Sequence, residues 1–170
     1  PGLNDVRSKF GHAVEWIQRG INYSQFKFTS LDVYKDEIPS YDNADAWIIT
    51  GSSTSVYDDL GWIVDLEQVI KRAIEVEKPI LGICFGHQLI AQAMGGRVEK
   101  NPKGWDLGSY LMEYILPHPL FDGIDIADYF YNSHQDIVVE LPYGFMSLAE
   151  NRMGNQAFHY GKRLYGVQFH

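Results

Sequence analysis

The only cysteine in the 170-residue chain lies between two glycines, where an apolar run gives way to a helical pattern. The stretch reads Gly82-Ile83-Cys84-Phe85-Gly86 within PILGICFGHQLIAQAMGG, residues 79–96. A nucleophile on a sharp strand-to-helix turn brings the residues two before and two after it close together, so both positions favour glycine. A lone cysteine is more often a buried small hydrophobe, but this spacing predicts that Cys84 is a nucleophile.

The helix expected after Cys84 bears on the chemistry of the thiol. It begins near Gly86, and its unpaired N–H groups and the positive end of its dipole point toward the sulfur. Such surroundings favour the thiolate, which is the form that attacks. We therefore expect Cys84 to be ionised more readily than an ordinary cysteine.

A cysteine nucleophile usually works with a general base, and the chain has six histidines. We favour His170, which closes RLYGVQFH (163–170) at the end of a buried strand, where its ring could emerge near Cys84. His134 in NSHQD is the second choice, although it could equally orient a loop or contact the substrate. His87 is expected to point away from the sulfur along the new helix. The remaining histidines have no neighbour that suggests a role: His12, His118 and His159.

A tetrahedral intermediate at Cys84 also needs N–H donors for its oxyanion. The geometry of the turn predicts one donor at Phe85, the residue after the nucleophile. A second could come from Thr50-Gly51-Ser52-Ser53, a loop of small residues after a buried strand, although an ordinary polar loop would look the same. No group of His, Cys, Asp and Glu has metal-ligand spacing, so we expect neither a metal nor a cofactor.

The elements that must position these residues alternate between strands and helices. Helical spacing covers 12–20, 62–77 and 86–96. Strands are predicted at 26–33, 44–51 and 79–83, the second of them buried on both faces. Parallel strands with helical crossovers follow from this order. Shorter strands separated by turns complete the chain, at 109–116, 128–133, 136–142, 145–151, 155–160 and 163–169.

Composition limits the class of protein. An apolar content of 45% and a charged content of 21% fit one globular α/β domain over residues 1–170. The net charge of −8 argues against nucleic acid and polybasic membrane binding, and no apolar run approaches the ~20 residues that span a bilayer. A single cysteine forms no internal disulfide, which fits a reducing, cytoplasmic compartment. The start at Pro1-Gly2 and the stop at His170 lead us to expect native sequence missing on both sides.

Three blocks of the chain together resemble the class I (triad) glutamine amidotransferase domain, in particular the glutaminase domain of the GMP synthase type. They are ITGSSTSVYDD (48–58), PILGICFGHQLIAQAMGG (79–96), and the segment from NSHQDIVVELPYG to YGVQFH (132–170). The blocks stand in the family's order, and the resemblance covers nearly the whole chain. It implies a flavodoxin-like, mostly parallel central sheet flanked by helices, with a small antiparallel extension.

The resemblance also implies a reaction and its residues. Cys84 would attack the side-chain amide of glutamine to give a γ-glutamyl thioester and ammonia, while His170 moves the proton. The N–H groups of Ser52 and Phe85 would stabilise the oxyanion. Gly51, Gln88 and the backbone around Asn132, Ser133 and His134 would hold the substrate. KGWDLG (103–108) resembles the pocket segment, and Asp136 matches an acidic position of the family. A synthetase that accepts the ammonia is a possible partner.

The sequence departs from the family in two ways. The family's base histidine is followed by Pro and a Glu that orients the imidazole, and no such Glu can be assigned here. The loop usually written Gly-Gly-Pro reads Gly51-Ser52-Ser53, where Ser52 still supplies an N–H. Two alternatives therefore stay open: a γ-glutamyl peptidase or hydrolase with the same thioester chemistry, and a non-catalytic module that kept the fold.

Overall fold

The structure is a computed structural model that describes residues 8, 11, 13–21, 25–35, 37–125 and 128–170. The chain forms two compact units, residues 1–32 and 33–170. In the first, helix α2 (Ala13–Gly20) confirms the helix predicted at 12–20, whose residue 12 lies outside the described part. The strand predicted at 26–33 is wrong. Phe26 is 60% exposed and Phe28 is 37% exposed. The two rings contact each other edge to face, and neither residue belongs to a strand.

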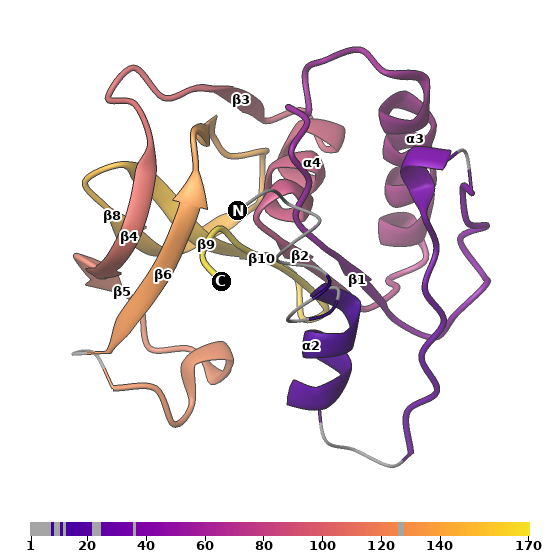
Figure 1. Cartoon of the computed structure of the whole chain (residues 1–170), viewed down its shortest axis with the longest axis horizontal. Coiled ribbons are helices and arrows are strands. Elements are labelled where there is room, and N and C mark those ends of the chain that lie inside the picture. Colours follow the sequence, from indigo (N-terminus) through magenta and orange to yellow (C-terminus); the bar gives the residue numbers. More distant parts are fainter. Residues whose placement is uncertain (1–7, 9–10, 12, 22–24, 36, 126–127) are drawn as a thin grey trace. The chain divides into compact units, whose positions relative to one another are not determined.

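A six-stranded mixed sheet organises the second unit, with the order β1-β2-β10-β9-β8-β5 (Figure 1). The first three strands run parallel, as the alternation of strands and helices predicts. The other three join by antiparallel pairing. The strands are β1 (Trp47–Ile49), β2 (Ile80–Ile83), β10 (Leu164–Val167), β9 (Gly154–Tyr160), β8 (Met146–Asn151) and β5 (Tyr114–Ile115).

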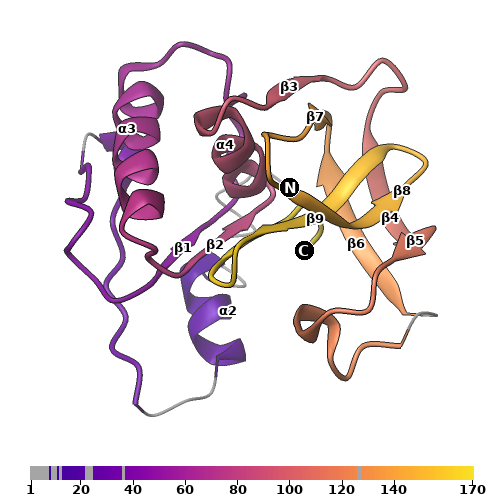
Figure 2. The same cartoon turned by 180° about the vertical axis from the view of Figure 1, so that it is seen from behind.

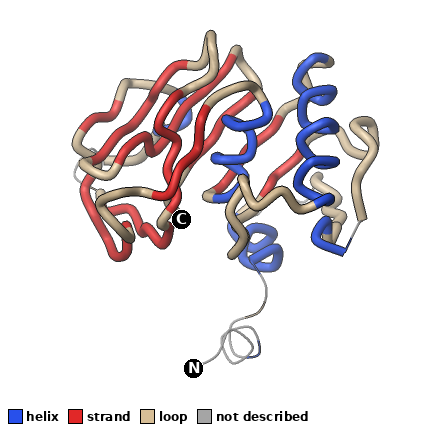
Figure 3. The backbone as a smooth tube through the Cα atoms, turned by 90° about the horizontal axis from the view of Figure 1, so that it is seen from above, coloured by secondary structure: helices blue, strands red, loops and turns tan. Residues whose placement is uncertain are grey.

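Two helices pack beside the parallel strands, α3 (Gly61–Glu75) and α4 (Phe85–Ala93). Helix α4 contacts β1, β2 and β10 and is buried on almost every side, whereas α3 packs on α4 and on the 3-10 turn η1 (Val33–Lys35). Figure 3 shows both helices grouped at one side of the strands of this unit. The helical spacing predicted at 62–77 is confirmed, and α3 contributes its buried Ile63, Leu66, Ile70 and Ala73 to the core.

Two smaller antiparallel pairs complete the unit (Figure 2). Strand β3 (Arg97–Lys100) pairs with β7 (Asp136–Glu140), and β4 (Asp106–Leu111) pairs with β6 (Tyr129–His134). A second apolar core includes residues of β6, β8 and β9, and the 3-10 turn η2 (Pro119–Phe121) contributes to it. Its buried members are Met112, Phe121, Phe130, Leu148, Ala149 and Ala157.

The mixed sheet, the flanking helices and the antiparallel extension confirm the predicted fold class, but three details differ. Strand β3 was not predicted, because RVEK has one apolar residue, the buried Val98. The predicted strand 109–116 is two strands in two sheets, since the chain leaves β4 at Leu111 and enters β5 at Tyr114. Strand β1 is half-buried rather than buried on both faces, because β2 is its one partner among the described strands.

Candidate active site

The turn between β2 and α4 holds Cys84 in a backbone conformation that side chains rarely adopt. Its φ is 54° and its ψ is −103°, and its N–H donates to Val167 O at 2.8 Å. A methyl group at Gly82 would lie 2.5 Å from the Gly86 carbonyl, and one at Gly86 would collide with the carbonyl oxygen of Ile49. Both glycines are therefore required by close backbone approach, as the spacing around Cys84 predicts.

The Cys84 thiol is buried, with 7% of the residue exposed. Burial is the main cause that raises its pKa to about 11. The Phe85 backbone and the Gln168 side chain oppose this rise through hydrogen bonding, while the charge of Asp136 adds to it. The expectation of a readily ionised thiol is therefore wrong for this structure, because desolvation outweighs the helix end.

The two predicted catalytic side chains, Cys84 and His170, both lie beside Gly51. A methyl group on this glycine would lie 3.6 Å from His170 Cε1 and 3.9 Å from Cys84 Sγ. The His170 N–H donates to Tyr131 O at 2.8 Å, which fixes this residue against β6. Burial lowers the pKa of His170, so its imidazole is neutral at pH 7 and can accept a proton. The structure thus assembles a thiol and a neutral imidazole at the carboxyl ends of parallel strands.

His134, the second candidate base, is held in a different setting. Its Nε2 lies 3.4 Å from Asp106 Oδ2, and both side chains are almost fully buried. Its Nδ1 lies 3.1 Å from Asp136 O. Burial lowers the pKa of His134, although the charge of Asp106 opposes this. In the described part of the chain it is therefore His134, and not His170, whose imidazole lies beside a carboxylate.

The two predicted oxyanion donors differ in their surroundings. Phe85 is the first residue of α4, and its ring packs against Trp62 with the centroids 5.6 Å apart. Its backbone also acts on the Cys84 sulfur and lowers the pKa of the thiol. Ser52 lies in an exposed loop, where its Oγ is 2.8 Å from Thr54 Oγ1. Gly51, between β1 and Ser52, lies beside Cys84 and His170.

The residues predicted to hold the substrate lie on two elements. On α4, Gln88 is buried, and its Nε2 donates to Asp136 O and to Gln168 Oε1, each at 2.9 Å. On β6, side chains alternate, so Asn132 and His134 are buried while Ser133 is exposed. Both side-chain polar atoms of Asn132 are buried without a hydrogen-bond partner in the described part of the chain.

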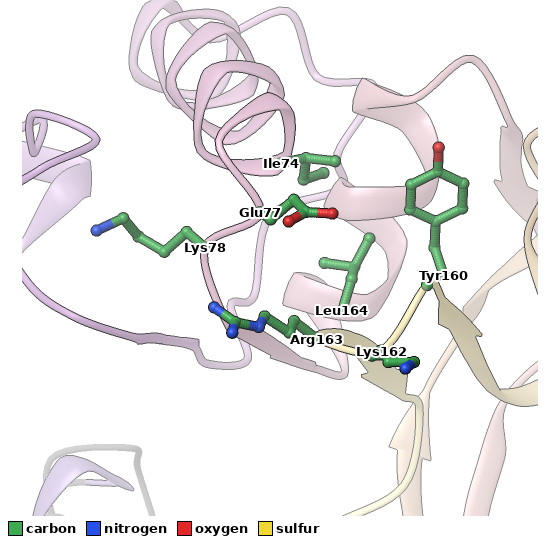
Figure 4. A pocket seen from close by; sticks show the side chains of 8 residues that line it. Ile74, Glu77, Lys78, Tyr160, Lys162, Arg163 and Leu164 are labelled. Atoms are coloured by element: carbon green, nitrogen blue, oxygen red, sulfur yellow. The ribbon is translucent and has the colours of Figure 1, made fainter.

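Two open cavities lie in this unit. One, of about 480 Å³, is lined by Lys103, Trp105, Arg152 and Met153, and so includes part of the KGWDLG segment. The other, of about 440 Å³, is drawn in Figure 4 and lies where β2 and β10 begin, at the opposite end of these strands from Cys84. Its lining contains none of the candidate site residues: Ile74, Glu77, Lys78, Tyr160, Gly161, Lys162, Arg163 and Leu164.

Asp106, within the KGWDLG segment, and Gln168 were not predicted as individual site residues. Asp106 is buried, lies beside His134 and accepts a hydrogen bond from Asn151 Nδ2 at 3.0 Å. Gln168 is fully buried beside the nucleophile turn. Each is a polar residue next to apolar ones in a strand-like run, and that could have marked them as internal partners.

The sequence model of the class-I glutamine amidotransferases matches residues 9–170. The chain belongs to the class-I glutamine amidotransferase family. A glutamine-hydrolysing GMP synthase from Clostridium novyi is 40% identical over 134 residues, which are 75% of this chain and 24% of that protein. Gamma-glutamyl peptidase 4 from Arabidopsis thaliana is 34% identical over 135 residues, which are 75% of this chain and 54% of that protein.

A solved structure also matches this class-I glutamine amidotransferase domain. The crystal structure of a glutamine amidotransferase from Thermotoga maritima gives a TM-score of 0.77 at 26% identity, covering 92% of this chain and 68% of the other. The chain spans about a quarter of the GMP synthases and about half of the γ-glutamyl peptidases that it matches.

No group of three or more His, Cys, Asp or Glu residues in the described part of the chain could hold a metal ion. None of the helices described is both long enough and apolar enough to cross a membrane.

Proposed function

We propose that this class-I amidotransferase domain hydrolyses the side-chain amide of glutamine to glutamate and ammonia. The observation that carries the proposal is that Cys84 Sγ and the His170 ring both lie beside Gly51, next to a strained turn that only Gly82 and Gly86 permit. Membership of the family and the likeness to glutamine-hydrolysing enzymes support the same reaction.

In the proposed mechanism, His170 takes the thiol proton as Cys84 Sγ attacks the amide carbon. The N–H groups of Phe85 and Ser52 stabilise the oxyanion. The C–N bond then breaks, the proton from His170 leaves with the nitrogen as ammonia, and a γ-glutamyl thioester remains. Water, deprotonated by His170, adds to the thioester and releases glutamate and the thiol.

Proton transfer at the moment of attack suits this site better than a preformed thiolate. Burial raises the pKa of Cys84 and lowers the pKa of His170, so the neutral pair predominates at pH 7. Gln88, Gly51 and the Asn132–His134 segment hold the glutamine in this proposal. Gln88 Nε2 is already committed to two acceptors, which leaves its Oε1 for the substrate.

The proposal includes a setting and a partner. A reduced cysteine suits the cytoplasm. The GMP synthases that match the chain are about four times longer than the matched region, which suits a synthetase as the acceptor of the ammonia. The second candidate is hydrolysis of γ-glutamyl peptides, favoured by the likeness to gamma-glutamyl peptidase 4, of which the chain covers a larger share than of the GMP synthases.

The test measures ammonia and glutamate released from glutamine by the full-length parent protein, with candidate synthetases present and absent. We expect Cys84→Ala and His170→Asn each to lose at least about 10³-fold in rate, since members of a catalytic unit are individually essential. His159→Asn, at a histidine that lies on β9 away from the turn, serves as the control and keeps the parent rate. Faster release of glutamate from a γ-glutamyl dipeptide than from glutamine would favour the second candidate. Equal rates for Cys84→Ala and the parent would remove the assigned nucleophile.

A further inference from the structure

Gln168 lies directly beside the nucleophile turn, at the end of β10. Val167 pairs with Ile83 in the parallel register and accepts the Cys84 N–H at 2.8 Å. Val167 and Phe169 pack on the second apolar core, so the alternation of a strand turns Gln168 to the side of α4. The Gln168 side chain therefore faces α4, the helix that begins directly after Cys84.

The orientation of the Gln168 amide is set by a second glutamine. Gln168 is fully buried, and its Oε1 accepts from Gln88 Nε2 at 2.9 Å. Gln88 Nε2 is in turn held by Asp136 O at 2.9 Å. Because Oε1 is engaged, Nε2 is the free end of the Gln168 amide. This Nε2 is buried and has no hydrogen-bond partner among the described residues.

A buried donor without an acceptor destabilises the resting fold, and a catalytic role is one explanation for keeping it. We propose that Gln168 is a hydrogen-bond donor to the Cys84 sulfur that acts when the thiolate forms, and that Gln88 is the positioning residue that holds its amide in this orientation. The inference rests on the proposed role of Cys84 as nucleophile and extends it to two residues behind the sulfur.

The other groups around the sulfur do not replace this donor. The Phe85 backbone acts on the sulfur but is also the expected donor to the oxyanion, so it cannot serve both at once. Asp136 carries a negative charge that disfavours the thiolate. His170, beside Gly51, must accept the proton. The effect of Gln168 on the Cys84 thiol has the sign of a donor, since it lowers the pKa that burial raises.

The test uses two substitutions at Gln168 in the full-length protein and follows alkylation of Cys84 by iodoacetamide from pH 7 to 10, read by mass spectrometry. Cys84 is the only cysteine of the chain, so each adduct reports one site. Gln168→Met keeps the size but removes the donor. Gln168→Glu keeps an acceptor for Gln88 but replaces the donor by a negative charge. We expect alkylation about tenfold slower than the parent for Met, corresponding to one pKa unit, and slower still for Glu.

Gln156→Met is the matched control, because Gln156 is also a fully buried glutamine and its backbone carbonyl accepts the Gln168 N–H at 2.8 Å. It should keep the parent's alkylation profile, with thermal unfolding recorded for every variant to confirm a folded state. Parent-like rates for both Gln168 variants, or an equal slowing in Gln156→Met, would overturn the inference. Ammonia release is measured in parallel. A parent that alkylates but releases no ammonia contradicts the proposed function and leaves this comparison intact.

Discussion

At the scale of single residues, burial controls the charge of the candidate site. Cys84 and His170 are both shifted toward their neutral forms, in opposite pKa directions, by the same loss of water. Cys84 and His170 are both neutral in the resting chain and form no thiolate–imidazolium pair. Attack by the sulfur and transfer of its proton must therefore occur together. His87, three residues after Cys84, shows the same effect in a residue without a catalytic role.

His87 predicts how the stability of the fold depends on pH. Its ring packs against Phe158 with the centroids 4.5 Å apart, and complete burial lowers its pKa to about 3. The unfolded chain therefore binds a proton at this histidine that the folded chain does not, from about pH 6.5 downward. The neutral His87 contributes fully to stability above pH 6.5, and this contribution is lost as pH falls toward 3. At pH 5 the free energy of unfolding has fallen by about 2 kcal/mol through this histidine. His134 and His170 act in the same direction.

Urea unfolding at pH 7.5 and pH 5.0 checks this expectation. His87→Phe should reduce the loss of unfolding free energy between the two pH values by about 2 kcal/mol, whatever its effect on stability at pH 7.5. His159→Asn, at a partly exposed histidine, should show the full loss of the parent. The same loss in His87→Phe as in the parent would show that His87 titrates normally in the fold.

At the scale of elements, the turn from β2 to α4 is fixed by the approach of three backbone segments. Gly82 lies against Gly86, and Gly86 lies against Ile49 of the neighbouring β1. The hydrogen bond from Cys84 N–H to Val167 O holds the turn to β10. The strain of the positive φ at Cys84 is thus sustained by the strands on either side of β2.

Gly86→Ala should destabilise this arrangement because its methyl group would collide with the Ile49 carbonyl, which is backbone and cannot move away cheaply. We expect a loss of about 2–3 kcal/mol, a drop of roughly 5–10 °C in Tm, measured by thermal unfolding. Gly61→Ala is the matched control, at the first residue of α3, where a methyl group meets nothing within 4 Å. It should raise stability by about 0.5–1 kcal/mol. A Gly86→Ala protein as stable as the parent would show that the backbone of the turn accommodates the methyl group without loss of unfolding free energy.

At the scale of the whole 33–170 unit, Asp136 joins parts of the site that are far apart in sequence. Its carboxylate accepts from Ser55 Oγ at 2.5 Å and from Tyr57 Oη at 2.8 Å, both in the loop after β1. Its backbone carbonyl accepts from Gln88 on α4. One residue at the start of β7 therefore ties the loop of the proposed oxyanion donor to the helix behind the nucleophile.

Asp136→Asn should have opposite effects on two measurements. Loss of the negative charge, which raises the pKa of Cys84, should speed alkylation of the thiol. Weaker bonds to Ser55 and Tyr57 should loosen the loop and slow ammonia release by roughly tenfold, the value of one charge-assisted hydrogen bond. Tyr57→Phe, which removes one of the bonds and keeps the charge, should slow ammonia release less and leave alkylation unchanged. Parallel changes in both measurements for Asp136→Asn would contradict this division of roles.

Much of the architecture could be predicted from the sequence because its signals are local. The apolar stripe of α3 and the strand-turn-helix around Cys84 depend on residues near in the chain, and the structure confirms both. The strand predicted at 26–33 and the single strand predicted at 109–116 were wrong. Alternating apolar residues do not show whether a segment pairs with another strand, or in which sheet it does so. The short β3 gave no signal, since it depends on pairing with the distant β7.

The candidate site divides in the same way. By itself, the sequence determined that a cysteine stands on a turn requiring two glycines, and it favoured His170 as the base. Only the tertiary structure decided that His170 and Cys84 both lie beside Gly51, that Asp106 lies beside His134, and that Gln168 accepts a hydrogen bond from Gln88. It also reversed the expected ionisation of Cys84, because a pKa is set by the water that the whole fold excludes and not by the neighbouring residues alone.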